Sequence, residues 1–159
     1  SFYDAYLQSL PLPEDMLGAA WRWSADVLDA QPSAELVAEA KALRQQIDEE
    51  FFILKAAGAT QLASGTLLTQ DIWDFGRALV KTRALDVGEG LALVPGIETA
   101  NHDENALFEV FIDDDGQLGL TAGCAVLLVD RDVSASEEVY ISYGDKDNYQ
   151  LLLNYGFTL

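Results

Sequence analysis

The residues best suited to chemistry gather in residues 141–159, a stretch that holds three tyrosines. Apolar and polar residues alternate up to Tyr143, as in a strand, and Gly144 then ends the alternation. The next residues predict a short apolar helix, capped by Asp147 and ended by a glycine. A strand that delivers Tyr143 to a turn, supported by such a helix, would fix one phenol in space. The alternative is that these tyrosines only pack in the core or at its rim.

The sequence lacks the residues that most other kinds of catalytic or binding site need. His102 is the only histidine and Cys124 the only cysteine, so we expect no zinc site and no disulfide framework. No serine stands in a nucleophile-elbow sequence, and residues 88–90 lack the third glycine of a dinucleotide loop. The acidic run 113–115 lacks the spacing of a calcium loop. It predicts a hairpin turn in which Gly116 has positive φ.

The first half of the chain has helical periodicity. A helix is predicted over 33–57, capped by Ser33, and another over 69–83, capped by Thr69. The apolar face of the first is Leu36, Ala40, Leu43, Ile47, Phe51 and Leu54, and that of the second is Ile72, Phe75, Leu79 and Val80. Shorter helices are expected over 2–10 and 24–28. We expect the three tryptophans to pack in the core; a substrate groove is the alternative.

From Leu91 onward the period changes to two. Short strands are predicted over 91–94, 107–112, 118–121, 125–129 and 139–143. Helices followed by strands predict an α+β protein, and 159 residues suffice for one domain with a real core.

Composition limits the possible partners. The formal net charge of −18 disfavours nucleic acid and favours a protein partner with a basic surface, unless the acidity serves only solubility or a salty habitat. No apolar run is long enough to span a membrane, and no signal segment begins the chain. The single cysteine fits a reducing, intracellular compartment.

Several motifs stand out together: EEVYISYG at 137–144, KDN at 146–148, LNYGF at 153–157, LVP at 93–95 with Asn101-His102, and Thr82-Arg83. Taken together, they resemble a known family, the SET-domain lysine methyltransferases of the RuBisCO large-subunit type. The motifs stand in the family's order, and the resemblance is strong over residues 72–159. It implies a SET-type fold of short strands with a helical insert and a C-terminal segment threaded through a loop as a pseudoknot.

The resemblance also implies a site. Tyr143 resembles the catalytic tyrosine, whose hydroxyl orients the acceptor amine. Asn101, His102, Arg83 and Tyr155 would bind S-adenosylmethionine, whereas Glu98, Leu85 and Phe108 would line the substrate channel. The activity implied is transfer of a methyl group to a lysine of a protein, with a non-histone substrate favoured. The location implied is the cytoplasm or a plastid.

The chain departs from the family pattern in ways that bear on this prediction. Phe108 stands where a tyrosine is common, and Leu85 where an aromatic residue is common. No N-terminal Gly-x-Gly donor loop and no C-terminal helical substrate domain are found. We therefore expect residues 1–83 to be an insert-like part and 84–159 a C-terminal SET core. Together they would form one structural unit, and the chain would be a fragment of a longer protein, an excised unit or a reduced relative. Two alternatives to the lysine enzyme stay open: a non-catalytic protein-binding module, and a histidine-directed methyltransferase.

Overall fold

The computed structural model describes residues 2–86, 90–106, 109–116, 123–129 and 131–159. The chain forms two compact units, named here by their content. The strand unit comprises Ser1–Ser9 and Arg83–Lys146, and the helical unit comprises Leu10–Thr82 and Asp147–Leu159. The sequence-based division into an insert-like part, 1–83, and a SET core, 84–159, concerns family correspondence and stays a prediction.

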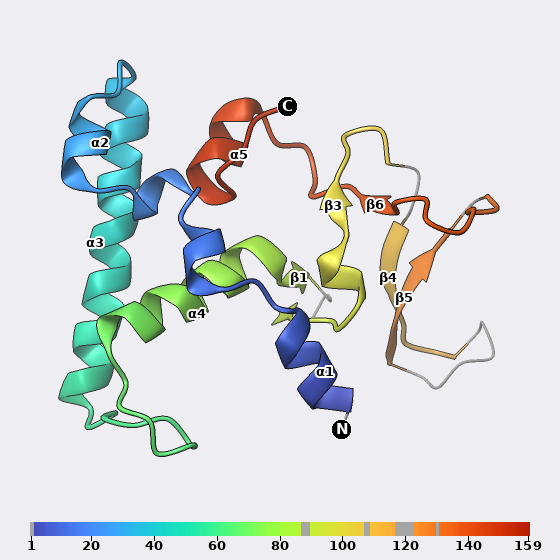
Figure 1. Cartoon of the computed structure of the whole chain (residues 1–159), viewed down its shortest axis with the longest axis horizontal. Helices are drawn as coiled ribbons and strands as arrows, with labels where there is room; N and C mark the ends of the chain where they lie inside the picture. The colour runs from blue at the N-terminus through green and yellow to red at the C-terminus, as the bar shows by residue number, and fades with distance from the viewer. Residues whose placement is uncertain (1, 87–89, 107–108, 117–122, 130) are drawn as a thin grey trace. The chain divides into compact units, whose positions relative to one another are not determined.

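The helical unit is built around its longest helix, α3 (Figure 1). Its elements are the 3-10 turns η1 (Pro13–Met16) and η2 (Ala20–Arg22), and the helices α2 (Ala25–Asp29), α3 (Ala34–Ala56), α4 (Gln70–Arg83, whose last residue belongs to the strand unit) and α5 (Asn148–Asn154). The expected caps are present, because the side chains of Ser33 and Thr69 accept the N–H groups of Leu36 and Ile72 at 3.2 and 3.3 Å. The predicted positions of α3 and α4 are therefore confirmed.

The core of the helical unit lies between α3, η2 and α5. Its buried members are Ala19, Ala20, Trp21, Leu28, Leu36, Ala40, Ile47, Ala78 and Leu153. Trp23 and Trp73 are partly buried against it, so the predicted packing role of the tryptophans is confirmed. Trp21 and Trp23 also line a surface groove of about 300 Å³.

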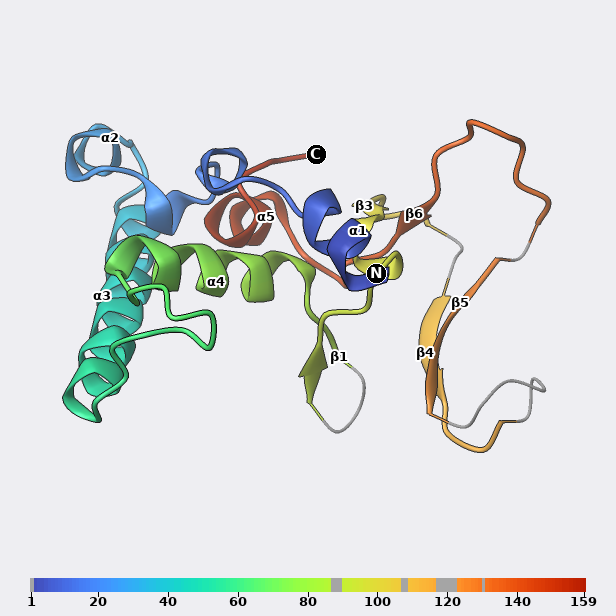
Figure 2. The same cartoon turned by 60° about the horizontal axis from the view of Figure 1, so that its bottom comes forward.

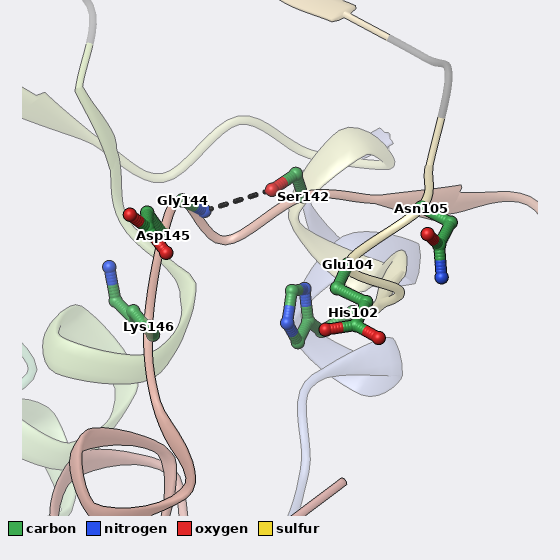
Figure 3. A pocket seen from close by; sticks show the side chains of 7 residues that line it. All are labelled: His102, Glu104, Asn105, Ser142, Gly144, Asp145 and Lys146. Atoms are coloured by element: carbon green, nitrogen blue, oxygen red, sulfur yellow. Dashed lines mark hydrogen bonds between the residues drawn. The ribbon is translucent and has the colours of Figure 1, made fainter.

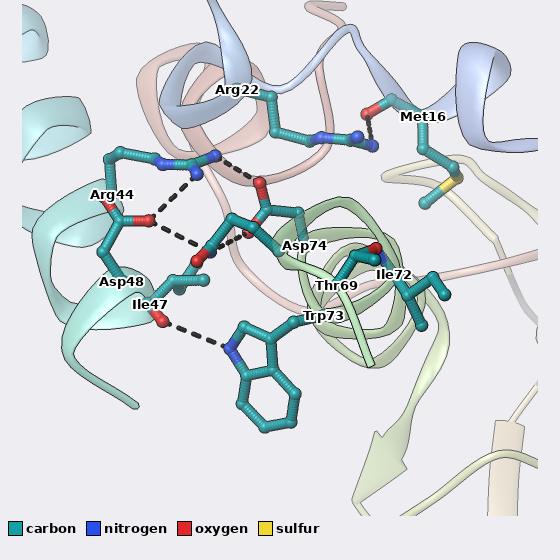
Figure 4. Close-up of polar contacts among 10 residues, drawn as sticks. Met16, Arg22, Arg44, Ile47, Asp48, Thr69, Ile72, Trp73 and Asp74 are labelled. Carbon is teal, nitrogen blue, oxygen red and sulfur yellow. Dashed lines mark hydrogen bonds and ion pairs between the residues drawn. The ribbon is translucent and has the colours of Figure 1, made fainter. Parts of the chain in front are cut away.

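The buried face of α4 differs from the prediction. Asp74, Ala78 and Leu79 are buried, whereas Ile72, Phe75 and Val80 are only partly so. An aspartate fits there because Arg44 of α3 pairs with it at 2.6 Å while also binding Asp48 at 2.9 Å (Figure 4). The periodicity of apolar residues misses such a position, since the charged partner comes from another helix.

Gly156, after α5, lies directly against the backbone of Gly18. A Cβ atom at Gly156 would stand 2.3 Å from the carbonyl carbon of Gly18, well inside contact distance. Gly156 also has a φ of +88°, in the left-handed region. Two backbones therefore meet at a point where only glycine fits, and this contact joins the C-terminal end of the chain to the segment before η2.

The strand unit holds short ladders rather than one large sheet. Its elements are α1 (Phe2–Ser9), β1 (Leu85–Asp86), β2 (Leu91–Ala92), η3 (Ile97–Thr99), β3 (Asn101–His102), β4 (Glu109–Asp113), β5 (Cys124–Leu128) and β6 (Tyr140–Ile141). Strands β1 and β2 pair antiparallel, as do β4 and β5, whereas β3 and β6 pair in parallel. The β4–β5 ribbon is visible in both views (Figure 2).

Two predicted strands are shorter than expected. The strand expected over 91–94 ends at Ala92, because the Val94 carbonyl accepts the Glu98 N–H and starts a turn. The strand expected over 139–143 keeps only Tyr140–Ile141. The turn predicted at 113–116 has the expected glycine conformation, since Gly116 has a positive φ of +66°.

Two predictions cannot be compared with the structure. The strand predicted over 118–121, and residues 107–108 of another predicted strand, lie outside the described residues. Within the described part of the chain, no helix is both long and apolar enough to cross a membrane.

We predict that Gly156→Ala destabilises the protein more than Gly58→Ala. Both glycines have nearly the same φ, +88° and +90°, so each alanine carries a left-handed strain of about 1–2 kcal/mol. Only Gly156 adds a steric clash, which costs a further ~1–3 kcal/mol, since nothing lies within 4 Å of a Cβ at Gly58. Urea unfolding of the two variants measures the difference. Equal losses of stability would contradict the close backbone contact.

We predict that Asp74→Ala lowers the free energy of unfolding by about 2–3 kcal/mol, because it leaves the Arg44 guanidinium without its buried partner. Asp29→Ala is the matched control. It removes an ion pair with Lys41 in which both side chains are more than half exposed, so its cost should stay below about 1 kcal/mol. Thermal or urea unfolding compares the two, and similar losses would argue against a structural role for the buried pair.

Candidate functional site

The site begins with two short strands that are distant in sequence. Strand β3 pairs in parallel with β6, placing Asn101 opposite Tyr140 and His102 opposite Ile141. The N–H of Asp103 continues the ladder by donating to the Ile141 carbonyl at 3.2 Å. Ile141 is 2 % exposed, so an apolar side chain anchors the pair. The predicted proximity of 141–143 to Asn101-His102 is confirmed; the threading of the C-terminal segment stays a prediction.

Tyr143 leaves the end of β6 and is held by several contacts. Its hydroxyl donates to the Ala100 carbonyl at 2.9 Å, and its backbone N–H donates to Nδ1 of His102 at 3.2 Å. The ammonium of Lys146 donates to the Tyr143 carbonyl at 2.7 Å. The phenol ring stacks on the His102 imidazole, with centroids 5.1 Å apart. The hydroxyl, the ring and the backbone of Tyr143 are therefore all held by contacts.

These contacts determine the tautomer of the neutral His102 imidazole, and burial determines the charge of the Tyr143 phenol. Since Nδ1 of His102 accepts a hydrogen bond, the neutral imidazole carries its proton on Nε2. Burial raises the pKa of the Tyr143 phenol above 10, and the nearby positive charge of Arg83 opposes that rise. The phenol is consequently neutral around pH 7. It acts there as a hydrogen-bonding group and not as a phenolate base.

A polar hollow of about 470 Å³ adjoins these residues (Figure 3). Its lining residues are His102, Glu104, Asn105, Ser142, Gly144, Asp145 and Lys146. The turn at its edge is local, because Ser142 Oγ accepts the Gly144 N–H at 3.1 Å and Gly144 has a φ of +94°. Hydroxyl, amide, carboxylate and ammonium groups together suit a polar, charged ligand.

Arg83 and Glu98 are joined by a hydrogen bond in the strand unit. One guanidinium NH2 group of Arg83 donates to the backbone carbonyl of Glu98 at 3.1 Å. The Glu98 residue is only 3 % exposed. The phenol of Tyr6, from α1, belongs to the same cluster: burial, and next the Glu98 carboxylate, raise the pKa of Tyr6 to about 12. Among the described residues, none completes a hydrogen bond with the Tyr6 hydroxyl or with either carboxylate oxygen of Glu98.

Asn101 is exposed, and its side chain has a partner. Its amide nitrogen donates to the Glu138 carboxylate, which also accepts the Tyr140 hydroxyl at 2.9 Å. These two hydrogen bonds, the one from Asn101 first, lower the pKa of the Glu138 carboxyl. Asn101 and His102 are neighbours on one strand, so their side chains point to opposite faces of the β3–β6 pair.

The structure brings together five of the eight predicted site residues: Tyr143, Asn101, His102, Arg83 and Glu98, all in the strand unit. Leu85 lies in β1, opposite Ala92. Tyr155 lies in the helical unit, where it follows α5 and meets Phe157 edge to face at 6.1 Å. Phe108 lies outside the described residues. The roles assigned to all eight stay predictions.

Three contributors were missed from the sequence. The Ala100 carbonyl is a backbone group, which residue types cannot identify. Tyr6 is far away in sequence and reaches the site only through the fold. Lys146 offered a local signal, because it stands in the turn after Gly144, where a long cationic side chain can reach back to a carbonyl. Within the described part of the chain, no group of three or more His, Cys, Asp or Glu residues could hold a metal ion.

Comparisons with known proteins identify the fold. No family model and no curated protein matches the sequence. Among matching solved structures is the SET domain of LSMT bound to lysine and AdoHcy, with a TM-score of 0.76 and 22% identity over 99% of this chain and 37% of that one. The same domain bound to methyllysine and AdoHcy gives 0.75 and 20%, over 99% and 36%. Rubisco LSMT bound to AdoMet gives 0.69 and 21%, over 97% and 34%.

The chain therefore has the fold of a SET domain, and the predicted α+β, SET-type class is confirmed. It spans little more than a third of the length of the chains that it matches.

We predict that the wild type loses more stability than Tyr6→Phe as the pH rises from about 10 to about 12. The pKa of Tyr6 is raised from 10.0 to about 12 by folding, so the neutral phenol is favoured in the folded state. That contribution is fully present below pH 10 and is lost as the pH approaches 12. Unfolding curves of both proteins across this range make the measurement. Parallel loss of stability in the two would contradict the buried position of the Tyr6 hydroxyl.

Proposed function

We propose that this chain belongs to an S-adenosylmethionine-dependent protein-lysine N-methyltransferase. The observation that carries the proposal is the fixed phenol of Tyr143, hydrogen-bonded to Ala100 and stacked on His102, beside the Asn101-His102 strand of a SET fold. Similar SET domains were solved with lysine or methyllysine and AdoHcy bound, which supports both the donor and the acceptor proposed here.

The residues present fit a methyl donor with a charged amino-acid end. Such a group needs hydrogen-bond donors and acceptors in a polar hollow, and the hollow beside His102 supplies both, with Lys146 as a cation. Arg83 adds a buried Nε–H that has no acceptor among the described residues. Asn101, His102 and Arg83 would hold the donor, together with Tyr155. When bound, the group supplies an electrophilic methyl on a positive sulfonium.

The phenol of Tyr143 orients the acceptor. Its own proton is committed to the Ala100 carbonyl, so the lone pairs of its oxygen stay available to accept an N–H of the incoming amine. An amine held in this way has its nitrogen lone pair set in one direction. A fixed direction of this lone pair increases the rate of methyl transfer by a large factor, because the entropy of alignment has already been lost before the reaction.

The acceptor must enter as a neutral amine. A free lysine has a pKa near 10.4, so most of it is charged at pH 7. An apolar channel and a nearby positive charge both disfavour the ammonium form. Arg83 provides a positive charge close to Tyr143. The walls that we assign to the channel are Leu85 and Phe108, with the backbone carbonyl of Glu98 as an acceptor of weak hydrogen bonds.

The acidity of the chain, −18 in formal charge, favours a protein substrate whose surface around the target lysine is basic. The location proposed is intracellular, in the cytoplasm or a plastid. A histidine acceptor and a purely protein-binding role remain as the competing hypotheses.

The direct test is a calorimetric titration of the full-length protein with S-adenosylmethionine, followed by transfer of a labelled methyl group to proteins of a cell extract. We expect saturable donor binding and labelled lysines, identified by mass spectrometry. Labelled histidines would shift the assignment to the histidine-directed activity. No donor binding and no labelling would favour the binding module.

We predict that Tyr143→Phe lowers turnover by about ten- to a thousand-fold, equivalent to about 1.4–4 kcal/mol of transition-state stabilisation. Donor affinity should change little, because the substitution removes one oxygen and keeps the ring on His102. Tyr140→Phe is the matched control, since its hydroxyl bonds only Glu138 in the described structure. An active enzyme that is indifferent to Tyr143→Phe would exclude Tyr143 as the catalytic tyrosine and leave Tyr155 as the next candidate.

A further inference from the structure

The backbone N–H of Tyr143 is bonded to a side chain at a place where a strand would use a backbone carbonyl. The parallel ladder of β3 and β6 ends with the bond from the Asp103 N–H to the Ile141 carbonyl. Two residues farther along, a continued ladder would pair the next N–H with a backbone carbonyl. The acceptor of the Tyr143 N–H is instead Nδ1 of His102, at 3.2 Å. A carbonyl oxygen accepts at every pH, whereas an imidazole nitrogen accepts only while it carries no proton.

A proton on Nδ1 would remove this hydrogen bond and spare the other contact between the two residues. In the imidazolium both ring nitrogens are donors, so Nδ1–H would face the Tyr143 N–H. The stacked rings, with planes 21° apart, tolerate a cation because the face of an aromatic ring attracts positive charge. The part of Tyr143 that the proton releases is therefore its backbone.

The backbone of Tyr143 sets the direction of its phenol. His102 holds its N–H, and Lys146 holds its carbonyl at 2.7 Å, so the Cα–Cβ bond is fixed from both sides. At the far end of the side chain, the hydroxyl bonds the Ala100 carbonyl at 2.9 Å, and a hydrogen bond weakens steeply when it is misaligned. Loss of the N–H bond would therefore also loosen the orientation of the hydroxyl.

The surroundings of His102 allow such a proton to arrive. The residue is half-buried and lines the polar hollow, so it is in contact with solvent. The carboxylates of Glu104, after β3, and of Asp145, after β6, line the same hollow and attract an imidazolium, whereas the Lys146 ammonium repels it. The remaining charge near the stacked rings is Arg83, at the end of α4, which acts on the Tyr143 phenol.

We propose that the imidazole of His102 is a positioning residue for Tyr143 and works as a proton-operated switch: the neutral ring holds the Tyr143 N–H and thereby orients the phenol, and the protonated ring releases both. The consequence for turnover rests on the proposed methyltransferase activity, whereas the consequence for the Tyr143 N–H does not.

The test follows two NMR signals of the untagged whole protein between about pH 5 and 8, the range in which histidine side chains ordinarily change charge. His102 is the only histidine, so its ring protons report its titration without further assignment. The ¹⁵N-labelled amide of Tyr143, assigned with Tyr143→Phe, reports the hydrogen bond through its protection from hydrogen exchange. We expect this protection, corrected for the effect of pH on a free amide, to fall about tenfold as His102 gains its proton.

Two variants separate the hydrogen bond from the ring. His102→Asn places Oδ1 where Nδ1 stands and cannot titrate in this range, so the Tyr143 amide should stay protected throughout. His102→Phe keeps a ring for the stack and removes the acceptor, so the amide should be poorly protected at every pH. Should either variant not fold, the two signals of the wild type decide alone.

In the enzyme assay each turnover rate is divided by that of His102→Asn at the same pH, because the acceptor lysine also titrates. We expect this ratio to fall about tenfold across the titration of His102, at saturating S-adenosylmethionine. Protection of the Tyr143 amide that stays constant while His102 titrates would overturn the proposal, and so would a His102 that keeps one charge over the whole range. A wild type that transfers no methyl group would overturn the methyltransferase function, and exchange of the Tyr143 amide would still decide the positioning role.

Discussion

The parallel pairing of β3 with β6 is the contact on which the site depends. It is only two residues long on each side, so it cannot be stable by itself and needs the buried Ile141 and the continuing bond from Asp103. Because the pairing is parallel, both strands leave it in the same direction. Tyr143, two residues beyond Ile141, therefore comes back beside His102 and can be held by it. Without this register the phenol would have no partner on β3.

The extent to which sequence predicted the structure follows from how local each feature is. Helices α3 and α4 depend on caps and on apolar spacing within one segment, and their positions agree with the prediction. Two strands were predicted too long, because a turn from Val94 to Glu98 follows the end of one and the Tyr143 N–H bonds His102 beyond the end of the other. Asp74 on a buried face could not be predicted from helical periodicity, since its partner Arg44 lies on another helix.

The candidate site likewise has features that a local motif indicates and features that depend on distant parts of the chain. Tyr143 and Asn101-His102 were found because their motifs resemble a family whose fold the structure shares at 20–22% identity. The partners that hold them could not be found in that way. The Ala100 carbonyl has no side-chain signature, and residues 10–82 of the helical unit separate Tyr6 from Glu98 in sequence. Residue types thus indicated the candidate side chains, whereas the groups that hold these side chains emerge only from the contacts.

In the strand unit, the surroundings of the Tyr143 phenol suit a group that orients a ligand better than a group that transfers a proton. Burial raises the pKa of Tyr143, which keeps the phenol protonated, and its proton is already donated to Ala100. A group in that state is a poor base and a good fixed acceptor. Arg83 opposes the effect of burial, and its guanidinium also donates to the backbone carbonyl of Glu98. The charge of Arg83 can therefore disfavour an ammonium near the phenol without ionising the phenol itself, because the same burial that strengthens the charge also penalises the phenolate.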